Sequence, residues 1–85
     1  KVALVKIDVE GAEVQVLRGL VPFLRRHRPS KVVVEVTPRF LAAYGSSRAE
    51  LYDLMAQLGF EPQVNSDEPQ YDELFRLPSV ERSDG

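Results

Sequence analysis

The 85-residue sequence contains no cysteine, and this excludes several classes of protein at once. Disulfide frameworks, thiolate nucleophiles, zinc fingers and iron–sulfur clusters all depend on cysteine side chains. Because disulfides belong to oxidising compartments, their absence favours a cytoplasmic protein. Histidine is also scarce, since the single His27 lies far in sequence from any cluster of carboxylates. Cysteine and histidine therefore indicate no metal site, and we assign no metal-ligating residue from them.

Charge of neither sign dominates, and long hydrophobic runs are missing. Eleven Lys and Arg residues and 13 Asp and Glu residues give a formal net charge of −2, so electrostatics offers no reason to expect nucleic acid as a partner. The apolar runs are short, as in residues 32–34, whereas a membrane span needs roughly 18 apolar residues. We therefore expect neither nucleic-acid nor membrane partners. A hydrophobic content of 44% is enough for one small packed domain.

The amino-terminal residues have the character of a buried strand. Residues 2–8, with the sequence VALVKID, carry Lys6 as their only interior charge, which predicts a parallel strand covered on both faces. The chain enters this run directly after Lys1, without a start methionine or a leading turn. We therefore expect the chain to be a piece cut from a longer protein.

Helical spacing of apolar residues follows a turn at Gly11. Pro22 lies within this pattern, and proline is tolerated in the first turn of a helix rather than deep inside it. We therefore predict two helices end to end, over residues 11–18 and 20–27, with Gly19 at the joint. The basic run RRHR that closes this stretch suits the carboxyl end of a helix, which attracts cations, better than an anion-binding site.

A second strand and a further helix are predicted beyond this stretch. Residues 31–37 are rich in β-branched side chains, which favour a strand. Ser47 and Glu50 match the S-x-x-E capping box that begins a helix, and the residues behind them place four apolar side chains on one helical stripe. Gly59 suits the left-handed position that ends a helix, and Phe60 is expected to fold back as a Schellman closure.

The last two extended segments, residues 60–64 and 73–77, are joined by a turn-rich polar stretch and predict an antiparallel hairpin. The order of elements is then strand, helix pair, strand, helix and hairpin, which indicates an α/β fold with a mixed sheet. We expect one domain over residues 1–78 and a polar tail over 79–85. Right-handed connections make the first two strands parallel neighbours, with a ligand crevice at their carboxyl ends.

Charged residues gather near the carboxyl ends of these two strands. If the first strand stays extended to residue 10, Lys6, Asp8 and Glu10 lie on one side of it. Glu35 is a charge in the second strand, where a buried strand should carry none. Because an unpaired buried charge is costly, we expect Lys6 and Glu35 to pair across the adjacent strands. The candidate catalytic residues are therefore Asp8, Glu10 and Glu35.

Each of these residues also has a purely structural interpretation. Asp8 could cap the following helix, and Glu10 and Glu13 could occupy its first turn, where the helix dipole favours carboxylates. Glu35 could belong to a structural ion pair with Lys6. Residue type and spacing alone do not separate these roles from catalytic ones.

Four segments together resemble one enzyme family. The string KIDVEGAE, the stretch RRHRPSKVVVEVTP, a capped helix ending in LGF and the closing ELFRLP are similar to the carboxyl-terminal half of FkbM-type methyltransferases, over residues 1–78. The resemblance implies the class I (Rossmann-like) methyltransferase fold, with two parallel strands and a terminal antiparallel hairpin whose last strand inserts beside the second parallel strand. It also implies S-adenosylmethionine as the cofactor and a hydroxyl of a small molecule, sugar or natural product as the methyl acceptor.

The resemblance assigns different tasks to the two halves of such an enzyme. Class I methyltransferases hold the cofactor mainly with a glycine-rich loop of the amino-terminal half, and the five glycines here are too far apart for such a loop. We therefore expect no cofactor-binding residues in this chain and no activity from the fragment alone. The resemblance makes Asp8 the first candidate for the base that orients or deprotonates the acceptor, followed by Glu10 and Glu35. Without a sheet neighbour, the first strand would be an apolar edge that favours self-association.

Two other functions are compatible with the sequence. The strand and helix units could belong to a TIM-type barrel, in which the K-I-D end of a strand binds a divalent metal for phosphodiester hydrolysis. A barrel needs parallel strands throughout, so an antiparallel final pair would decide against it. Alternatively, the chain could be a non-catalytic interaction module that has kept the half-sheet without a cofactor site.

Overall fold

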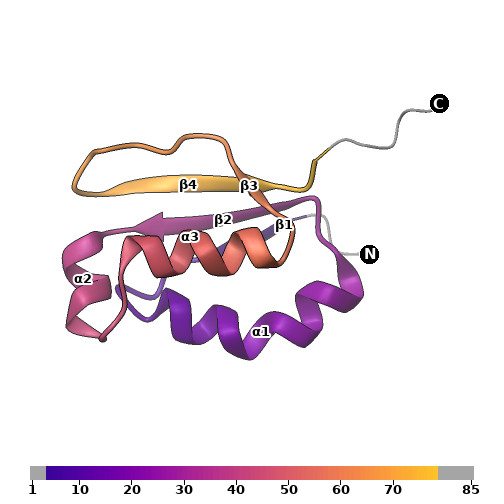
Figure 1. Ribbon diagram of the computed structural model, residues 1–85, viewed down its shortest axis with the longest axis horizontal. Helices are drawn as coiled ribbons and strands as arrows, with labels where there is room; N and C mark the ends of the chain where they lie inside the picture. The colour runs from indigo at the N-terminus through magenta and orange to yellow at the C-terminus, as the bar shows by residue number, and fades with distance from the viewer. Residues whose placement is uncertain (1–3, 79–85) are drawn as a thin grey trace.

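A computed structural model describes residues 4–78 of the chain. In chain order its elements are β1 (Leu4–Ile7), α1 (Glu13–His27), β2 (Lys31–Val36), α2 (Pro38–Ala43), α3 (Arg48–Gln57), β3 (Glu61–Pro62) and β4 (Tyr71–Arg76), as Figure 1 shows. The start of the predicted first strand and the predicted tail over 79–85 lie outside the described residues.

The strands form a mixed sheet in the order β1-β2-β4-β3. β1 and β2 are parallel neighbours, and β4 runs antiparallel beside β2 along its whole length. This confirms the predicted α/β class with a mixed sheet, and the antiparallel β4 argues against a TIM-type barrel. The predicted hairpin is present, but its first strand is confined to Glu61–Pro62. It ends there because the N–H groups of Val64 and Asn65 turn to the side chain of Glu73, while the Gln63 N–H is shared between Glu73 and the Leu74 carbonyl oxygen.

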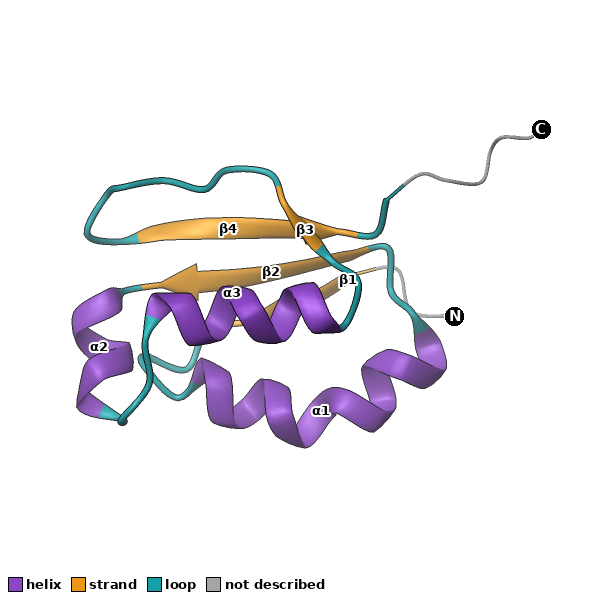
Figure 2. Ribbon diagram, in the orientation of Figure 1, coloured by secondary structure: helices purple, strands orange, loops and turns teal. Residues whose placement is uncertain are grey.

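The helices α1 and α3 pack on the same face of the sheet (Figure 2). Along β2, Val32, Val34 and Val36 are buried, whereas the residues between them point to the other face and are half-buried. The prediction of a first strand covered on both faces is wrong for the described residues, since Leu4 is 56% exposed. The remaining buried core residues are Ile7, Val14, Leu17, Leu24, Leu41, Leu51, Met55, Leu58, Phe60 and Phe75.

α1 is one continuous helix, which corrects the prediction of two helices joined at Gly19. Both Gly19 and Pro22 lie inside it. Pro22 removes one backbone hydrogen bond, and an interior proline costs about 3 kcal/mol. However, Val14, Leu17 and Leu24 form one fully buried stripe across the expected joint. Each such side chain contributes about 1.5–3 kcal/mol on burial, so packing outweighs the local cost.

α3 begins and ends as predicted from its caps. The Ser47 hydroxyl accepts a hydrogen bond from the Glu50 N–H at 3.1 Å. The Glu50 side chain turns to Arg18 on α1 instead of reaching back to the cap, so only half of the capping box forms. At the other end, Gly59 has a φ of 90°, and the Phe60 N–H donates to a carbonyl of the last turn at 3.0 Å. This is the expected Schellman closure.

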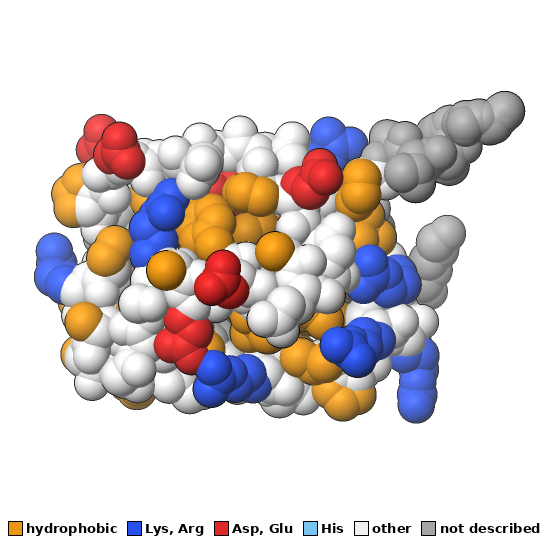
Figure 3. Space-filling view, in the orientation of Figure 1, with side chains coloured by type: hydrophobic (Ala, Val, Ile, Leu, Met, Phe, Trp, Pro, Cys, Tyr) orange, Lys and Arg blue, Asp and Glu red, His pale blue; other side chains and the backbone are white. Residues whose placement is uncertain are grey.

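The surface carries charges of both signs. On the face shown in Figure 3, acidic and basic side chains are mixed, and several of the basic ones gather toward the carboxyl end of α1. Arg25, Arg26 and His27 occupy the last turn of α1 and are exposed, as predicted for a helix end. Within residues 4–78, no helix has the length and the apolar character needed to cross a membrane.

The carboxyl ends of β1 and β2 lie at the same edge of the sheet (Figure 1). The turn after β1, the helix α2 and the connection from β3 to β4 all reach this edge. We call it the carboxyl edge, and it comprises residues 8–13, 35–38 and 65–71. These three segments therefore form the edge at which the sequence predicted a ligand crevice.

Candidate functional site at the carboxyl edge

Three carboxylates from separate segments meet at the carboxyl edge. Asp8 follows β1, Glu13 begins α1, and Glu35 lies near the end of β2. Each offers a carboxylate oxygen, and these oxygens all lie within 4.8 Å of one another. We refer to these three residues as the carboxylate cluster. The strand register brings two of them together, because Ile7 lies opposite Val34 and the residues that follow these two are Asp8 and Glu35.

Glu13 is the buried member of the cluster, with 1% of its surface exposed. Its carboxylate accepts hydrogen bonds from the N–H groups of Val9, at 3.1 Å, and Gly11, at 2.8 Å. The side chain thereby fixes the turn that carries Asp8. Glu13 lies in the first turn of α1, as the structural interpretation predicted. The N-cap is Ala12, so Asp8 does not cap the helix.

Gly11 is required in this turn by both conformation and space. Its φ of 112° is one that residues with a side chain rarely adopt. A Cβ atom at this position would lie 2.4 Å from the carbonyl oxygen of Phe40 in α2. The turn is thus packed directly against α2, which holds the cluster against the rest of the domain.

Glu35 contacts Asp8 on one side and Gln70 on the other. Gln70 Nε2 donates a hydrogen bond to Glu35 Oε2 at 2.9 Å. The hydrogen bond between the carboxyl groups of Glu35 and Asp8, together with partial desolvation, raises the pKa of Glu35 above its ordinary value. The negative charges of Asp8 and Asp72 act in the same direction, and the Gln70 hydrogen bond opposes them. Glu35 therefore retains its proton to higher pH than an isolated glutamate does.

Two sequence predictions about this edge are wrong. Within residues 4–78, no ion pair joins Lys6 to Glu35. Lys6 lies opposite Val33 in the register and is exposed, so it falls short of the Glu35 carboxylate. The alternation that grouped Glu10 with the other charges also fails, because β1 ends before residue 8 and Glu10 has a left-handed φ of 52°. Glu10 is exposed and does not belong to the cluster.

A second buried carboxylate, which the sequence analysis missed, fixes the connection between β3 and β4. Glu73 on β4 is fully buried. It accepts hydrogen bonds from the Tyr52 hydroxyl at 2.6 Å and from three backbone N–H groups. Those groups belong to Gln63, Val64 and Asn65, at 2.9, 2.8 and 2.6 Å. Burial alone would raise the pKa of Glu73, but the four hydrogen bonds outweigh it and lower the pKa.

A signal for Glu73 was present in the sequence. Tyr71, Glu73 and Phe75 alternate along β4, so a strand that begins at residue 71 places all three on the face toward the helices. The predicted strand began at residue 73, and this boundary concealed the alternation. A carboxylate between two aromatic residues on a core-facing row indicates a buried, hydrogen-bonded charge.

Arg48 extends this network toward the carboxyl edge. Its Nε donates to the Tyr71 hydroxyl at 2.8 Å, and its Nη2 donates to Asn65 Oδ1 at 2.7 Å. Its guanidinium also lies 4.2 Å from the centre of the Tyr52 ring. Burial and the adjacent carboxylate raise the pKa of Tyr52 far above its ordinary value, so its hydroxyl remains a donor. This network fixes the connection between β3 and β4. The last residue of that connection, Gln70, donates a hydrogen bond to Glu35 in the carboxylate cluster.

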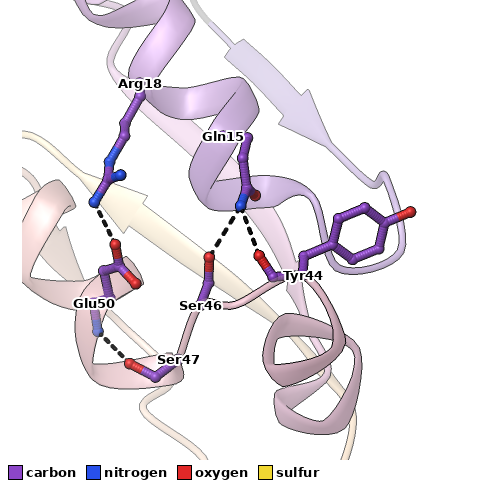
Figure 4. A network of polar contacts seen from close by, with 6 residues as sticks. All are labelled: Gln15, Arg18, Tyr44, Ser46, Ser47 and Glu50. Carbon is purple, nitrogen blue, oxygen red and sulfur yellow. Dashed lines mark hydrogen bonds and ion pairs between the residues drawn. The ribbon is translucent and has the colours of Figure 1, made fainter.

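Polar contacts also join α1 to the start of α3 (Figure 4). Gln15 Nε2 donates to the Tyr44 carbonyl at 3.0 Å and to Ser46 Oγ at 3.3 Å. One turn farther along α1, Arg18 pairs with Glu50. These contacts fix α1 relative to the connection between α2 and α3. None of these residues belongs to the cluster, so we assign them a structural role.

The turns at the carboxyl edge do not form a cradle for the cofactor implied by the resemblance. Such a cradle needs free backbone N–H groups in a turn between a strand and a helix. After β1, the N–H groups of Val9 and Gly11 are already occupied by Glu13. After β2, the chain passes directly into Pro38, which has no N–H group. We therefore assign no contact with S-adenosylmethionine to residues 4–78.

Comparison with known proteins identifies the family. The model of the methyltransferase FkbM domain matches residues 1–62. Comparisons with curated proteins and with solved structures found no match. The family match spans both parallel strands and therefore all three members of the carboxylate cluster. It confirms the resemblance carried by KIDVEGAE, RRHRPSKVVVEVTP and the capped helix, whereas the closing ELFRLP lies beyond the matched residues. The chain belongs to the FkbM methyltransferase domain family.

Proposed function

We propose that this chain forms the acceptor side of an S-adenosylmethionine-dependent O-methyltransferase. The proposed acceptor is a hydroxyl of a small molecule, a sugar or another natural product. Membership of the FkbM family supports methyl transfer. The observation that carries the finer proposal is that the carboxylate oxygens of Asp8 and Glu35 lie within 4.8 Å of each other at the carboxyl ends of two parallel strands, where open α/β sheets bind their ligands.

Methyl transfer to a hydroxyl requires that the acceptor oxygen be positioned and that it lose its proton. Asp8 is exposed at the carboxyl edge, so an acceptor can reach its carboxylate. Glu35 lies beside Asp8, and its raised pKa lets Glu35 hold a proton at higher pH than a lone carboxyl group would. A base is more effective for an alcohol when its pKa lies closer to the working pH. We assign Asp8 to accept or orient the acceptor's proton, with Glu35 as its partner.

The test is the substitution Asp8→Asn in the full-length protein. We expect turnover to fall by about 100-fold to 10,000-fold, the range typical of a lost general base. Cofactor affinity, measured by calorimetry, should stay unchanged because no described residue holds the cofactor. Asp53→Asn is the matched control, since Asp53 is an exposed carboxylate on α3 outside the cluster. Undiminished turnover of the Asp8→Asn enzyme would remove Asp8 from the mechanism.

A non-catalytic interaction module is the competing function, because the described residues lack a cofactor cradle. Calorimetry of the full-length protein with S-adenosylmethionine separates the two. An enzyme should bind the cofactor with measurable heat, whereas a scaffold without the site should give none. Family membership favours the enzyme.

A further inference from the structure

We propose that Asp8, Glu13 and Glu35 form a binding site for a divalent cation, with Thr37 as an additional oxygen donor. The three carboxylates come from three segments, and their oxygens lie within 4.8 Å of one another. A single cation with ordinary oxygen ligand distances fits between groups at this spacing. The sequence analysis assigned no metal ligand, because it found no cysteine and only one remote histidine, and it placed a metal near Asp8 only in the alternative of a TIM-type barrel.

The first argument is the balance of charge in the cluster. Within the described part of the chain, the one ion pair joins Arg18 to Glu50, so no basic side chain pairs with the cluster. Three carboxylates at this spacing repel one another unless a proton or a cation is present. Glu13 uses its two oxygens for the two N–H groups of the turn. A carboxylate offers about four acceptor positions, so Glu13 retains capacity for a further ligand.

The second argument is independent of the carboxylates and comes from Thr37. This residue is 3% exposed, and among residues 4–78 its Oγ1 is the buried side-chain atom that has no hydrogen-bond partner. Thr37 is the N-cap of α2, yet its side chain makes no capping hydrogen bond. Its backbone is extended, and it follows Glu35 by two positions, so both side chains leave the same face of the sheet at the carboxyl edge. A buried hydroxyl without a partner is unfavourable, and a cation or a water bound to the cation would satisfy it.

The donor set defines the class of cation. All four side chains offer oxygen, and neither histidine nor cysteine is among them, which favours Mg²⁺, Mn²⁺ or Ca²⁺ over zinc or copper. Exposed Asp8 leaves one side of the site open to solvent and to a further oxygen ligand. Mg²⁺ and Mn²⁺ suit such a site, because Mg²⁺ in particular commonly retains several waters beside a few carboxylates. If the proposed function holds, a cation here would lower the pKa of an acceptor hydroxyl bound to it.

The experiment is a titration of the 85-residue chain with Mn²⁺, followed by electron paramagnetic resonance of the free ion. We expect one Mn²⁺ site per chain, competed by Mg²⁺. Asp8→Asn and Glu35→Gln should each weaken binding by at least about 10-fold, as expected for loss of a charged ligand. Asp53→Asn should bind as the wild type does. Circular dichroism of each variant verifies folding, and Glu13 is left unchanged because it holds the turn.

Thr37→Val tests the second argument, since valine has a similar shape without the hydroxyl. We expect binding to weaken severalfold while the fold is kept. Absence of bound Mn²⁺ at millimolar concentration, or a site that survives both carboxylate substitutions, would overturn the proposal. Wild-type affinity of Thr37→Val would overturn the proposed ligand set. Because the readout is metal binding, a full-length protein that binds Mn²⁺ but transfers no methyl group would refute the proposed function and leave the cation site standing.

Discussion

Replacement of Glu73 by glutamine should strongly destabilise the domain without changing the size of the side chain. The Glu73 carboxylate is fully buried and accepts four hydrogen bonds, two on each oxygen. A glutamine amide has one oxygen and one nitrogen. If the nitrogen replaces Oε2, the Val64 N–H loses its acceptor, whereas the Gln63 N–H keeps the Leu74 carbonyl oxygen at 2.9 Å. If it replaces Oε1, the Tyr52 hydroxyl can rotate to accept, and only the Asn65 N–H is left without an acceptor.

Each orientation therefore leaves one backbone N–H without an acceptor, and this sets the expected magnitude. A buried N–H without an acceptor costs about 1–3 kcal/mol, and a hydrogen bond to a charged group is worth about 1 kcal/mol more than a neutral one. The two or three hydrogen bonds that the side chain retains therefore weaken as well, and the total loss is about 3–6 kcal/mol, close to the range found for broken buried charge networks. A domain of this length has a free energy of unfolding of about 4–13 kcal/mol. The variant should consequently be marginally stable.

The same carboxylate gives a pH dependence with a defined sign. The pKa of Glu73 is lower in the folded chain than the ordinary glutamate value of about 4.3 that applies when the chain is unfolded. Its stabilisation is therefore fully present above that ordinary value and is lost as the pH falls through the folded pKa. Wild-type stability should decline in this acid range. The Glu73→Gln variant lacks the titrating group and should show a shallower decline.

Urea unfolding followed by far-ultraviolet circular dichroism, at pH 7 and in the acid range, measures both effects. Asp72→Asn is the matched control, because Asp72 is the exposed neighbour on the same strand, and it should change stability by less than about 0.5 kcal/mol. Tyr52→Phe removes one of the four donors and gives a milder variant if Glu73→Gln does not fold. A Glu73→Gln chain within about 1 kcal/mol of the wild type would refute the reasoning, since it would mean that the unpaired groups find water.

Two further predictions concern the packing of the turn and the edge of the sheet. Gly11→Ala should lower the free energy of unfolding by about 2–4 kcal/mol, because the added Cβ meets the Phe40 carbonyl and the φ of Gly11 is unsuited to alanine. Gly19→Ala is the control within α1, since a Cβ at Gly19 meets no atom within 4 Å, and it should be neutral or stabilising. Both variants are compared by thermal unfolding, and equal effects of the two would contradict this reasoning. The 85-residue chain should self-associate through β1, an edge strand with exposed Leu4, and Leu4→Lys should reduce the association in sedimentation velocity. A wild-type chain that sediments as a monomer and has a high melting temperature would rule this out.

Local signals in the sequence were sufficient for elements whose stability is local. The capping residue Ser47 and the closing Gly59 define α3 through contacts within a few residues, and the structure has both. The β-branched run of β2 is likewise an intrinsic preference of consecutive side chains. The prediction for α1 was wrong because it considered only the local cost of Pro22 in a helix. The free energy gained by burying α1 side chains against the sheet is larger than this cost, and it depends on tertiary contacts that the local sequence does not show.

For the candidate site too, the sequence was sufficient for some features, and only the tertiary structure decided the others. The sequence alone determined that carboxylates stand at the ends of two strands and that KIDVEGAE belongs to a methyltransferase family, because residue type and order are enough for both. Only the tertiary structure decided that Asp8 meets Glu35 rather than Glu10 and that Glu35 pairs with Gln70 instead of Lys6. Those partners depend on the register between strands and on the conformation of each turn. Both are set by packing of the whole domain, so no short segment encodes them.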